Sequence, residues 1–450
     1  MPIVNYETIE EKGIDVESLL QNNQTNDLTS RLSSLIASQR RNLQNLSILV
    51  AVNFITAGIG FITTVKIANT LGKETFGLLA YGLAIAAYGG VFIRFGLDKT
   101  LVRDLIHYPE RFGELVAASL LLRWTLFAFV GAVFLAWKLA AGDGSDLSWG
   151  LLLVIIASSM MSMDLQPVYD SWHKMSRHAV YNLIQRCLYF AAIWTIIMIA
   201  PGRLNILWIG VATLGSVVLY LVMQHSWAMK RIVFSASRKP LFRAAIQMAK
   251  GNTTIWLAAM GGLSFGCLNQ LVLKHYCGTA ELGGYAAAWQ IASIAAVFLG
   301  HVGRIGNPMS AHITKEGICR REQVRFLMKY SAVMLLAATP IAVASIACPT
   351  FILKSIYRPE YSSAASSMRV MGIYMMVLSV GIVAAQFIVS CRMERTYFLS
   401  VIIGGAVSVA LCFLLIPSMG DLGAALALLI AHGITMGIYW FVMVRHIRRI

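Results

Sequence analysis

The sequence contains few acidic residues and none of the spacings that mark a catalytic or metal centre. Asp and Glu together number 21 in 450 residues, against 37 Lys and Arg. The nine histidines form no HExxH motif, and paired-carboxylate, nucleophile and phosphate-loop motifs are missing. We therefore expect a protein that is not an enzyme and that uses no cofactor and no metal.

Cysteine is also scarce, since the seven residues form no CxxC pair and lie mostly in or beside apolar segments. We expect small buried side chains rather than disulfides or zinc ligands. About 45 polar residues precede the first apolar run, so no cleavable secretory signal is expected at the N-terminus.

Long apolar runs dominate the rest of the chain. Hydrophobic residues make up 58% of it and charged residues 13%, with a mean hydropathy of +0.68, which is the balance of a membrane protein. A bilayer core of roughly 30 Å takes about 20 residues of helix, so the runs can be counted as spans. Nothing alternates with period two, as the strands of an outer-membrane barrel would. Twelve spans are predicted, at residues 46–70, 76–100, 114–138, 147–170, 179–200, 205–228, 250–275, 282–308, 326–348, 363–390, 396–416 and 421–444.

The connections between these spans alternate between basic and nearly uncharged. Basic residues cluster in every second connection, as in "KRIVFSASRKPLFR" after the sixth span, and at the C-terminal "RHIRRI". Short loops rich in Lys and Arg stay cytoplasmic, so both termini are predicted to be cytoplasmic. The same asymmetry explains most of the net charge of +16, whose expected partner is an anionic inner leaflet rather than nucleic acid.

The first 45 residues are predicted to form a cytoplasmic tail. Within it, "LTSRLSSLIASQRRNL" places Leu28, Leu32 and Leu35 on one helical face, which is typical of a short helix on the membrane surface. A polar tail without fixed structure is the alternative for the residues before it.

An internal repeat divides the chain into two halves. "LGKETFGLLAYGLAIA" after the first span resembles "CGTAELGGYAAAWQIA" after the seventh, and at one constant offset Gly72 aligns with Gly278 and Gly77 with Gly283. Because six spans separate the two stretches, the halves are expected to be parallel repeats with a cavity between them, as in alternating-access transporters. The predicted parts are a six-helix lobe at 46–228, a basic linker at 229–249, a second six-helix lobe at 250–444 and a basic end at 445–450.

Ionisable residues also occur inside the predicted spans, where they usually face a water-filled cavity or a partner. At about 1.5 Å per residue of helix, Lys66 and Arg369 fall toward the outer side, and the acids at depth are Asp98 and Asp164. Four arginines fall in the inner half: Arg94, Arg123, Arg186 and Arg304. This cationic excess suits an anionic substrate, and arginine can donate two parallel hydrogen bonds to a phosphate.

Two of these arginines have an acidic partner within reach. Arg94 can pair with Asp98 one turn along the chain. Arg186 can reach Asp164 on the preceding span, which would lock two helices together. The two acids are therefore candidates for salt bridges, and they are also candidates for a coupling-ion site.

Some of the remaining cations can interact with lipid headgroups instead of a substrate. Lys66 and Arg304 lie about a turn from a membrane interface and can extend to lipid headgroups. Arg123 has no acid three or four positions away and lies about two turns inside its span, which favours a role in the cavity. The last candidates are three polar side chains at depth, whose amide groups could hydrogen-bond to water in a cavity: Asn269, Gln270 and Gln290.

Three stretches of the sequence resemble one known family. They are "NFITAGIGFITTVKIANTLGKETFGLLAYGLAI", "RFGLDKTLVRDL" and "PSMGDLGAALALLIAHGI". They resemble the polysaccharide transporter, or O-unit flippase, family within the multidrug/oligosaccharidyl-lipid/polysaccharide exporter superfamily. Members often carry an arginine just before the Leu-Gly of the first stretch, where this chain has Asn69 and Thr70.

The resemblance implies a function in cell-surface polysaccharide biosynthesis, such as that of O-antigen or exopolysaccharide. A polyprenyl-diphosphate-linked oligosaccharide would be moved from the inner to the outer leaflet of a bacterial cytoplasmic membrane by alternating access. The diphosphate and glycan would occupy a cationic cavity while the lipid tail stays in the bilayer. Membrane lipids, a polysaccharide polymerase and chain-length machinery are the partners that it implies.

Two other functions stay open. A multidrug exporter of the same superfamily would share the fold, but a cavity for cationic drugs should be lined with acids. A membrane glycosyltransferase or polysaccharide polymerase should have a long exterior loop or a cluster of catalytic carboxylates. The buried excess is basic and the predicted exterior loops are short, so the flippase is favoured.

Overall fold

The computed structural model describes residues 49–142, 147–199, 202, 204–232, 238–313, 320–391 and 393–449. The contacts and sites described below lie in residues 52–450, which form one compact unit. The helix predicted within the first 45 residues lies outside the described part of the chain.

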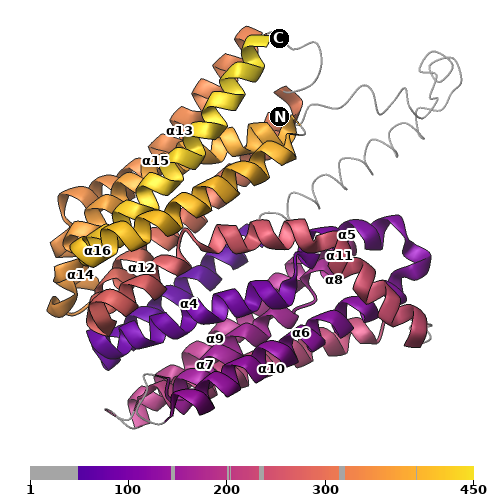
Figure 1. The fold of residues 1–450 in the computed structure, drawn as a ribbon, viewed down its shortest axis with the longest axis horizontal. Helices are drawn as coiled ribbons and strands as arrows, with labels where there is room; N and C mark the ends of the chain where they lie inside the picture. Colours follow the sequence, from indigo (N-terminus) through magenta and orange to yellow (C-terminus); the bar gives the residue numbers. More distant parts are fainter. Residues whose placement is uncertain are drawn as a thin grey trace, which may run out of the picture. The chain divides into compact units, whose positions relative to one another are not determined.

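Helices make up the architecture of the described residues (Figure 1). The first helix is Leu49–Leu71. The N-terminal half continues with α4 (Lys73–Arg94), α5 (Leu97–His107), η1 (Pro109–Arg111), α6 (Phe112–Ala141), α7 (Trp149–Met160), η2 (Met161–Met163), α8 (Gln166–Ser171), α9 (Met175–Ile199) and α10 (Ile206–Met229). The C-terminal half contains α11 (Arg238–Leu263), α12 (Cys267–Ile313), α13 (Arg320–Ala347), α14 (Pro349–Ile356), η3 (Pro359–Ala364), α15 (Ala365–Ser390) and α16 (Glu394–Arg449).

Ten helices in the described ranges are long and apolar enough to cross a membrane. Two of the helices, α12 with 47 residues and α16 with 56, are much longer than the others. Each contains one residue with non-helical backbone angles, Gly278 in α12 and Gly420 in α16. Since about 20 residues of helix cross a bilayer, the chain is a multi-pass, all-helical membrane protein.

The predicted span at 250–275 is interrupted in the structure. α11 ends at Leu263 and α12 begins at Cys267. Between them, the backbone N–H groups of residues 264–266 donate to carbonyls three positions earlier, as in a tighter turn. The local sequence GGLSFG explains the break, because glycine disfavours the interior of a helix.

Part of the predicted linker at 229–249 is also helical, because α11 begins at Arg238. Ala244 and Ala245 pack on Ala118 of α6. Asn252 accepts a hydrogen bond of 2.7 Å from the hydroxyl of Thr100 on α5. The start of α11 is thus attached to the N-terminal half of the chain.

The backbone repeats itself at the glycines that the sequence aligns. Gly72 has φ 79° and ψ 167°, and Gly278 has φ 85° and ψ 179°. Positive φ angles of this kind favour glycine, because it lacks a Cβ. Each glycine therefore breaks the helix at an equivalent position, just before α4 and within α12.

α4 and α12 cross each other through the second aligned pair of glycines. A Cβ on Gly77 would lie 1.8 Å from the carbonyl oxygen of Thr279, and a Cβ on Gly283 would lie 1.9 Å from that of Lys73. Lys73 and Thr279 are themselves equivalent at the same offset, so the contact is reciprocal. Only glycine at both positions lets the two backbones approach this closely.

Candidate functional site

Four charged side chains meet where α4, α5, α6 and the end of η2 come together. Arg94 is the last residue of α4, and the left-handed Phe95 and Gly96 separate it from α5, which carries Asp98. Arg94 lies 3.6 Å from Asp98 and 3.4 Å from Asp164. Two arginines and two aspartates share this cluster, so its formal charge is zero.

Arg123 of α6 is the most buried member, since only 2% of its side chain is exposed. Its Nη2 donates to Asp98 at 2.8 Å, and its Nη1 donates to the carbonyl oxygens of Asp164 at 2.7 Å and Ser162 at 3.3 Å. Arg123 is therefore not an unpaired cation in this conformation, and its predicted role in the cavity stays a prediction. A buried guanidinium needs such partners to offset the loss of its hydration.

Arg186 of α9 differs from these two arginines. The alternative in which it pairs with Asp164 is not seen, because Arg94 and Arg123 occupy that carboxylate. Arg186 is half-buried and, among the described residues, has no carboxylate within ion-pair distance. It is close enough to the phenols of Tyr189 and Tyr220 to interact with them electrostatically. Arg186 therefore lacks the carboxylate partners that Arg94 and Arg123 have.

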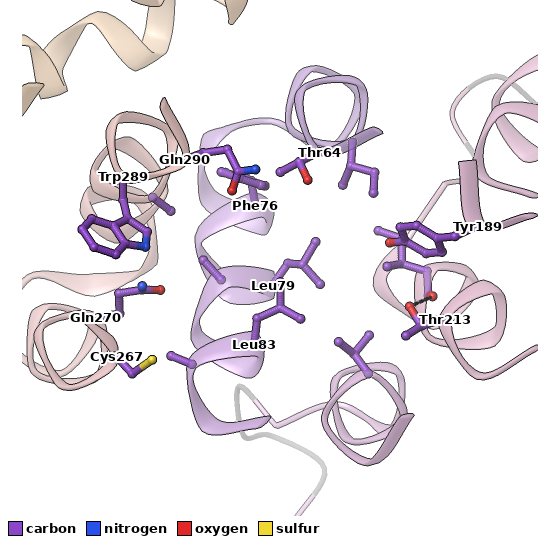
Figure 2. A pocket seen from close by; sticks show the side chains of 16 residues that line it. Thr64, Phe76, Leu79, Leu83, Tyr189, Thr213, Cys267, Gln270, Trp289 and Gln290 are labelled. Atoms are coloured by element: carbon purple, nitrogen blue, oxygen red, sulfur yellow. Dashed lines mark hydrogen bonds between the residues drawn. The ribbon is translucent and has the colours of Figure 1, made fainter. Parts of the chain in front are cut away.

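An internal cavity of about 230 Å³ lies between the two halves of the chain, one helical turn from Arg186. Tyr189 and Thr213 line one side from α9 and α10, and Cys267 and Gln270 line the other side from α12 (Figure 2). Most of the remaining lining is aliphatic, including Leu79 and neighbouring residues of α4. The cavity thus combines an apolar wall with a few hydrogen-bonding groups.

The structure separates the three polar residues that were predicted at depth. Gln270 and Gln290 line the cavity. Asn269 points elsewhere, since its Nδ2 donates to the carbonyl of Ala424 at 3.0 Å and its Oδ1 accepts from Cys412 at 2.9 Å. Asn269 therefore joins two helices, and its neighbour Gln270 is the one available to a ligand.

Two of the other predicted cations, Lys66 and Arg369, are not among the residues that line the cavity. The Lys66 ammonium lies 4.9 Å from the ring of Trp194 on α9, in a cation–π contact. Arg369 is exposed on α15. Arg304 belongs to α12, and its side chain lies outside the described part of the structure.

Two lysines at the ends of predicted spans were not among the predicted residues. Lys274 of α12 lies 5.1 Å from the ring of Tyr81 on α4 and so joins the two halves. Lys138 is 3% exposed and donates to the carbonyl of Gly142 at 2.9 Å. Both lie in predicted spans, so counting every lysine in those spans would have found them. Thr64, Tyr189 and Thr213 carry no such signal, because lone polar residues are common in apolar helices.

The predicted exterior end is closed by contacts between the two halves. The Lys73 backbone N–H donates to Glu360 at 3.1 Å, and its ammonium donates to Ser363 at 2.8 Å. The Tyr361 hydroxyl donates to the carbonyl of Ala68 at 2.9 Å. Together with the glycine crossing of α4 and α12, these bonds hold the two halves in contact at this end in this conformation.

A multi-pass helical protein with repeated halves, a largely apolar cavity between them and a half-buried arginine one turn from its lining has the build of a membrane transporter. Residues 42–304 match the model of the family described as "Polysaccharide biosynthesis protein". The match covers more than half of the chain, and the protein belongs to this family.

The similar proteins with descriptive names are exporters and flippases. The EPS I polysaccharide export inner membrane protein EpsE of Ralstonia solanacearum is 24% identical over 444 residues, which cover 89% of this chain and 97% of EpsE. The fold resembles that of the lipid II flippase MurJ in an inward closed conformation, with a TM-score of 0.72 at 12% identity, covering 88% of this chain and 87% of MurJ. It also resembles an inward-facing multidrug resistance MATE family transporter of the MOP superfamily, with a TM-score of 0.66 at 12% identity, covering 90% and 98% of the two chains. The expected family and an all-helical, multi-pass membrane fold are thereby confirmed.

Proposed function

We propose that the protein is a flippase that moves a polyprenyl-diphosphate-linked oligosaccharide from the inner to the outer leaflet of a bacterial cytoplasmic membrane, for cell-surface polysaccharide biosynthesis. Membership of the polysaccharide biosynthesis family supports a glycan substrate. The observation that carries the proposal is Arg186, a half-buried cation without a described carboxylate partner, one turn from the cavity between the halves.

Polar residues that line the cavity and arginines outside its lining would bind different parts of the substrate. The planar guanidinium of Arg186 would hold the diphosphate through parallel hydrogen bonds. Arg94, whose side chain is 39% exposed, would add a second positive charge. Gln270, Gln290 and Thr213 would bond to sugar hydroxyls. The aspartates of the charge cluster would keep Arg94 in place until substrate arrives.

The size of the cavity indicates that binding requires movement. A volume of about 230 Å³ falls below the roughly 300–1,000 Å³ typical of small-ligand sites. The halves must therefore separate at the cytoplasmic end before a glycan enters. Release outside requires the crossing of α4 and α12 to open instead, which is alternating access.

Removing the guanidinium of Arg186 tests the proposal. Arg186→Ala is expected to lower the flipping rate of a fluorescent polyprenyl-diphosphate oligosaccharide in proteoliposomes by roughly 10- to 100-fold, since hydrogen bonds to charged groups contribute about 1.5–3 kcal/mol. Arg186→Lys should retain part of the rate, because lysine keeps the charge but lacks the paired N–H donors of the planar guanidinium.

Arg369 provides the matched control for this measurement. It is an exposed arginine on α15, so Arg369→Ala removes the same charge away from the cavity and should change the rate by no more than about twofold. Normal flipping by Arg186→Ala would contradict the proposed site. Failure of the wild type to flip the fluorescent oligosaccharide would contradict the proposed function itself.

We further propose that the chain crosses the membrane twelve times, as two six-helix lobes with both termini in the cytoplasm. The breaks at Gly278 and Gly420 support this topology, because each would turn one long helix into two spans. The cytoplasmic ends follow from the basic connections.

Alkaline phosphatase fusions distinguish this topology from one with ten spans. The enzyme is active only outside the cytoplasmic membrane, so fusions ending after Gly278 and after Gly420 are expected to be active. A fusion after Arg231 and one at the C-terminus are expected to be inactive. Inactive fusions at both glycines would mean that α12 and α16 each cross the membrane only once.

The multidrug alternative is disfavoured by the cavity lining. Among the described residues that line it, none is Asp or Glu. A cation entering this cavity would meet hydrogen-bond donors and Arg186 nearby, and no compensating carboxylate.

A further inference from the structure

Three cations converge on one tryptophan ring at the predicted cytoplasmic end of the N-terminal half. The guanidinium carbons of Arg231 and Arg177 lie 4.0 Å and 4.3 Å from the centroid of the Trp227 ring, and the Lys174 ammonium lies 4.9 Å from it. We call these four residues the Trp227 cluster. Its three like charges repel one another, because their separations are comparable with the Debye length of about 8 Å at physiological salt.

No carboxylate in the described part of the chain balances this charge. None of the three cations forms an ion pair with a described residue, and Arg231 donates only to the backbone carbonyl of Trp227, at 2.9 Å. Asp170 is the nearest acid along the sequence, and it bonds to Gln166. This contrasts with Arg103 and Arg111 in the same half, which bond to Asp104 at 2.8 Å and to Glu114 at 2.9 Å.

The fold holds the cluster in place despite this repulsion. His173 adopts a left-handed conformation with φ 56° and reverses the chain between α8 and α9, which brings Lys174 and Arg177 to Trp227. The indole stacks on the buried ring of Tyr169 at 5.2 Å and meets Trp172 edge-on at 5.7 Å. The positive charges are therefore presented on a rigid aromatic base rather than on a mobile loop.

The neighbouring surface places the cluster at the boundary between hydrocarbon and headgroups. Val180 on α9 and Val222 on α10, each one to two turns away along its helix, are 39% and 53% exposed. Exposed aliphatic residues on a spanning helix contact lipid tails, and Trp and Tyr gather at the interface just beyond them. The cations therefore lie at the depth of lipid phosphates.

We propose that the Trp227 cluster is a binding site for the phosphate headgroup of an anionic phospholipid. Two arginines can bond to the phosphate oxygens in the bidentate manner, and Lys174 adds a third donor. The assignment to the cytoplasmic leaflet rests on the topology proposed above, but the binding itself does not depend on transport.

Native mass spectrometry of the purified full-length protein tests the site. Delipidated protein is mixed with equal amounts of phosphatidylglycerol and phosphatidylcholine. The measured quantity is the ratio of protein with one bound phosphatidylglycerol to protein with one bound phosphatidylcholine. The wild type is expected to prefer phosphatidylglycerol, and the double variant R177Q/R231Q should reduce that preference by about tenfold or more. The variant R177K/R231K keeps the charge and should lie between them.

The double variant R103Q/R111Q is the matched control, because it removes two positive charges from the same half whose partners are already carboxylates. It should keep the wild-type preference. An equal loss in this control would mean that net charge alone attracts the lipid and would overturn the proposal, as would an unchanged preference in R177Q/R231Q. Complete displacement of the lipid by millimolar inorganic phosphate would show a site for a soluble anion instead.

Discussion

Arg123→Ala is expected to destabilise the folded protein by about 3–5 kcal/mol, the usual cost of removing one partner from a buried ion pair. Arg123 has 2% of its side chain exposed, and Asp164 has 9%. Without the guanidinium, the carbonyls of Ser162 and Asp164 lose their donor as well. The loss of Arg123 costs less at Asp98, because its side chain is 37% exposed and still faces Arg94.

The measurement is the free energy of unfolding in mixed micelles, with Arg103→Ala as the control. Arg103 is also paired, at 2.8 Å from Asp104, but its side chain is 65% exposed. Exposed pairs contribute at most about 1 kcal/mol, so the control should remain close to the wild type. The difference between the two variants isolates the effect of burial.

A second substitution separates a structural role of Arg123 from a role in binding. In the background of Arg123→Met, Asp164→Asn removes the negative charge that would otherwise be left buried, so the double variant should be more stable than the single one. A substrate-binding arginine without a structural role would show no such recovery. Arg123→Ala with wild-type stability and no flipping would restore the sequence-based interpretation.

Sequence patterns predicted the membrane spans well because each span is recorded locally, in about 20 consecutive apolar residues. The patterns failed where a segment is apolar throughout, and so is predicted as one helix, but contains a turn in the structure. The break after Leu263 depends on the backbone conformations of glycines, and glycine is also common inside helices that stay intact. The deviation at Gly278, in contrast, falls in the predicted gap between the spans at 250–275 and 282–308. The spacing of the glycines alone does not show at which of them the helix is interrupted.

The charge cluster shows the same limit for the site. The pairing of Arg94 with Asp98 was predictable, because the two residues are four positions apart. Arg123 lies 25 residues from Asp98 and 41 from Asp164, so its pairing depends on how three separate helices pack. For the same reason, no pattern told Gln270 from Asn269, which are adjacent in sequence but point to different surroundings.

The internal repeat was the exception, a long-range feature that the sequence did contain. Equivalent glycines at 72 and 278 have nearly the same backbone angles, and those at 77 and 283 touch the equivalent carbonyls of the opposite half. A reciprocal contact of this kind requires an approximate twofold relation between α4 and α12 at the crossing. The repeat therefore aligned the glycines that form this contact, although the contact itself was not predicted.

Gly77→Ala is expected to prevent closure of the predicted exterior end and to stop transport. The new Cβ would lie 1.8 Å from the Thr279 carbonyl oxygen and 2.8 Å from the Gly283 nitrogen. Both are backbone atoms that cannot rotate away, so α4 and α12 have to separate. If the closed state falls from about 99% to 1% of the population, a shift of about 5.5 kcal/mol, flipping should slow about 100-fold.

Spin labels at Gly202 and Lys354, in a cysteine-free background, would report the separation of the two halves at that end. Gly77→Ala should move the distance distribution to longer values, whereas Gly215→Ala should leave it unchanged, because that glycine of α10 has no neighbouring atom within 4 Å of an added Cβ. Gly283→Ala should reproduce the effect of Gly77→Ala, since the crossing is reciprocal. A variant that kept the wild-type distances and still failed to flip its substrate would place the defect in binding, and the crossing would then be a fixed contact that does not open.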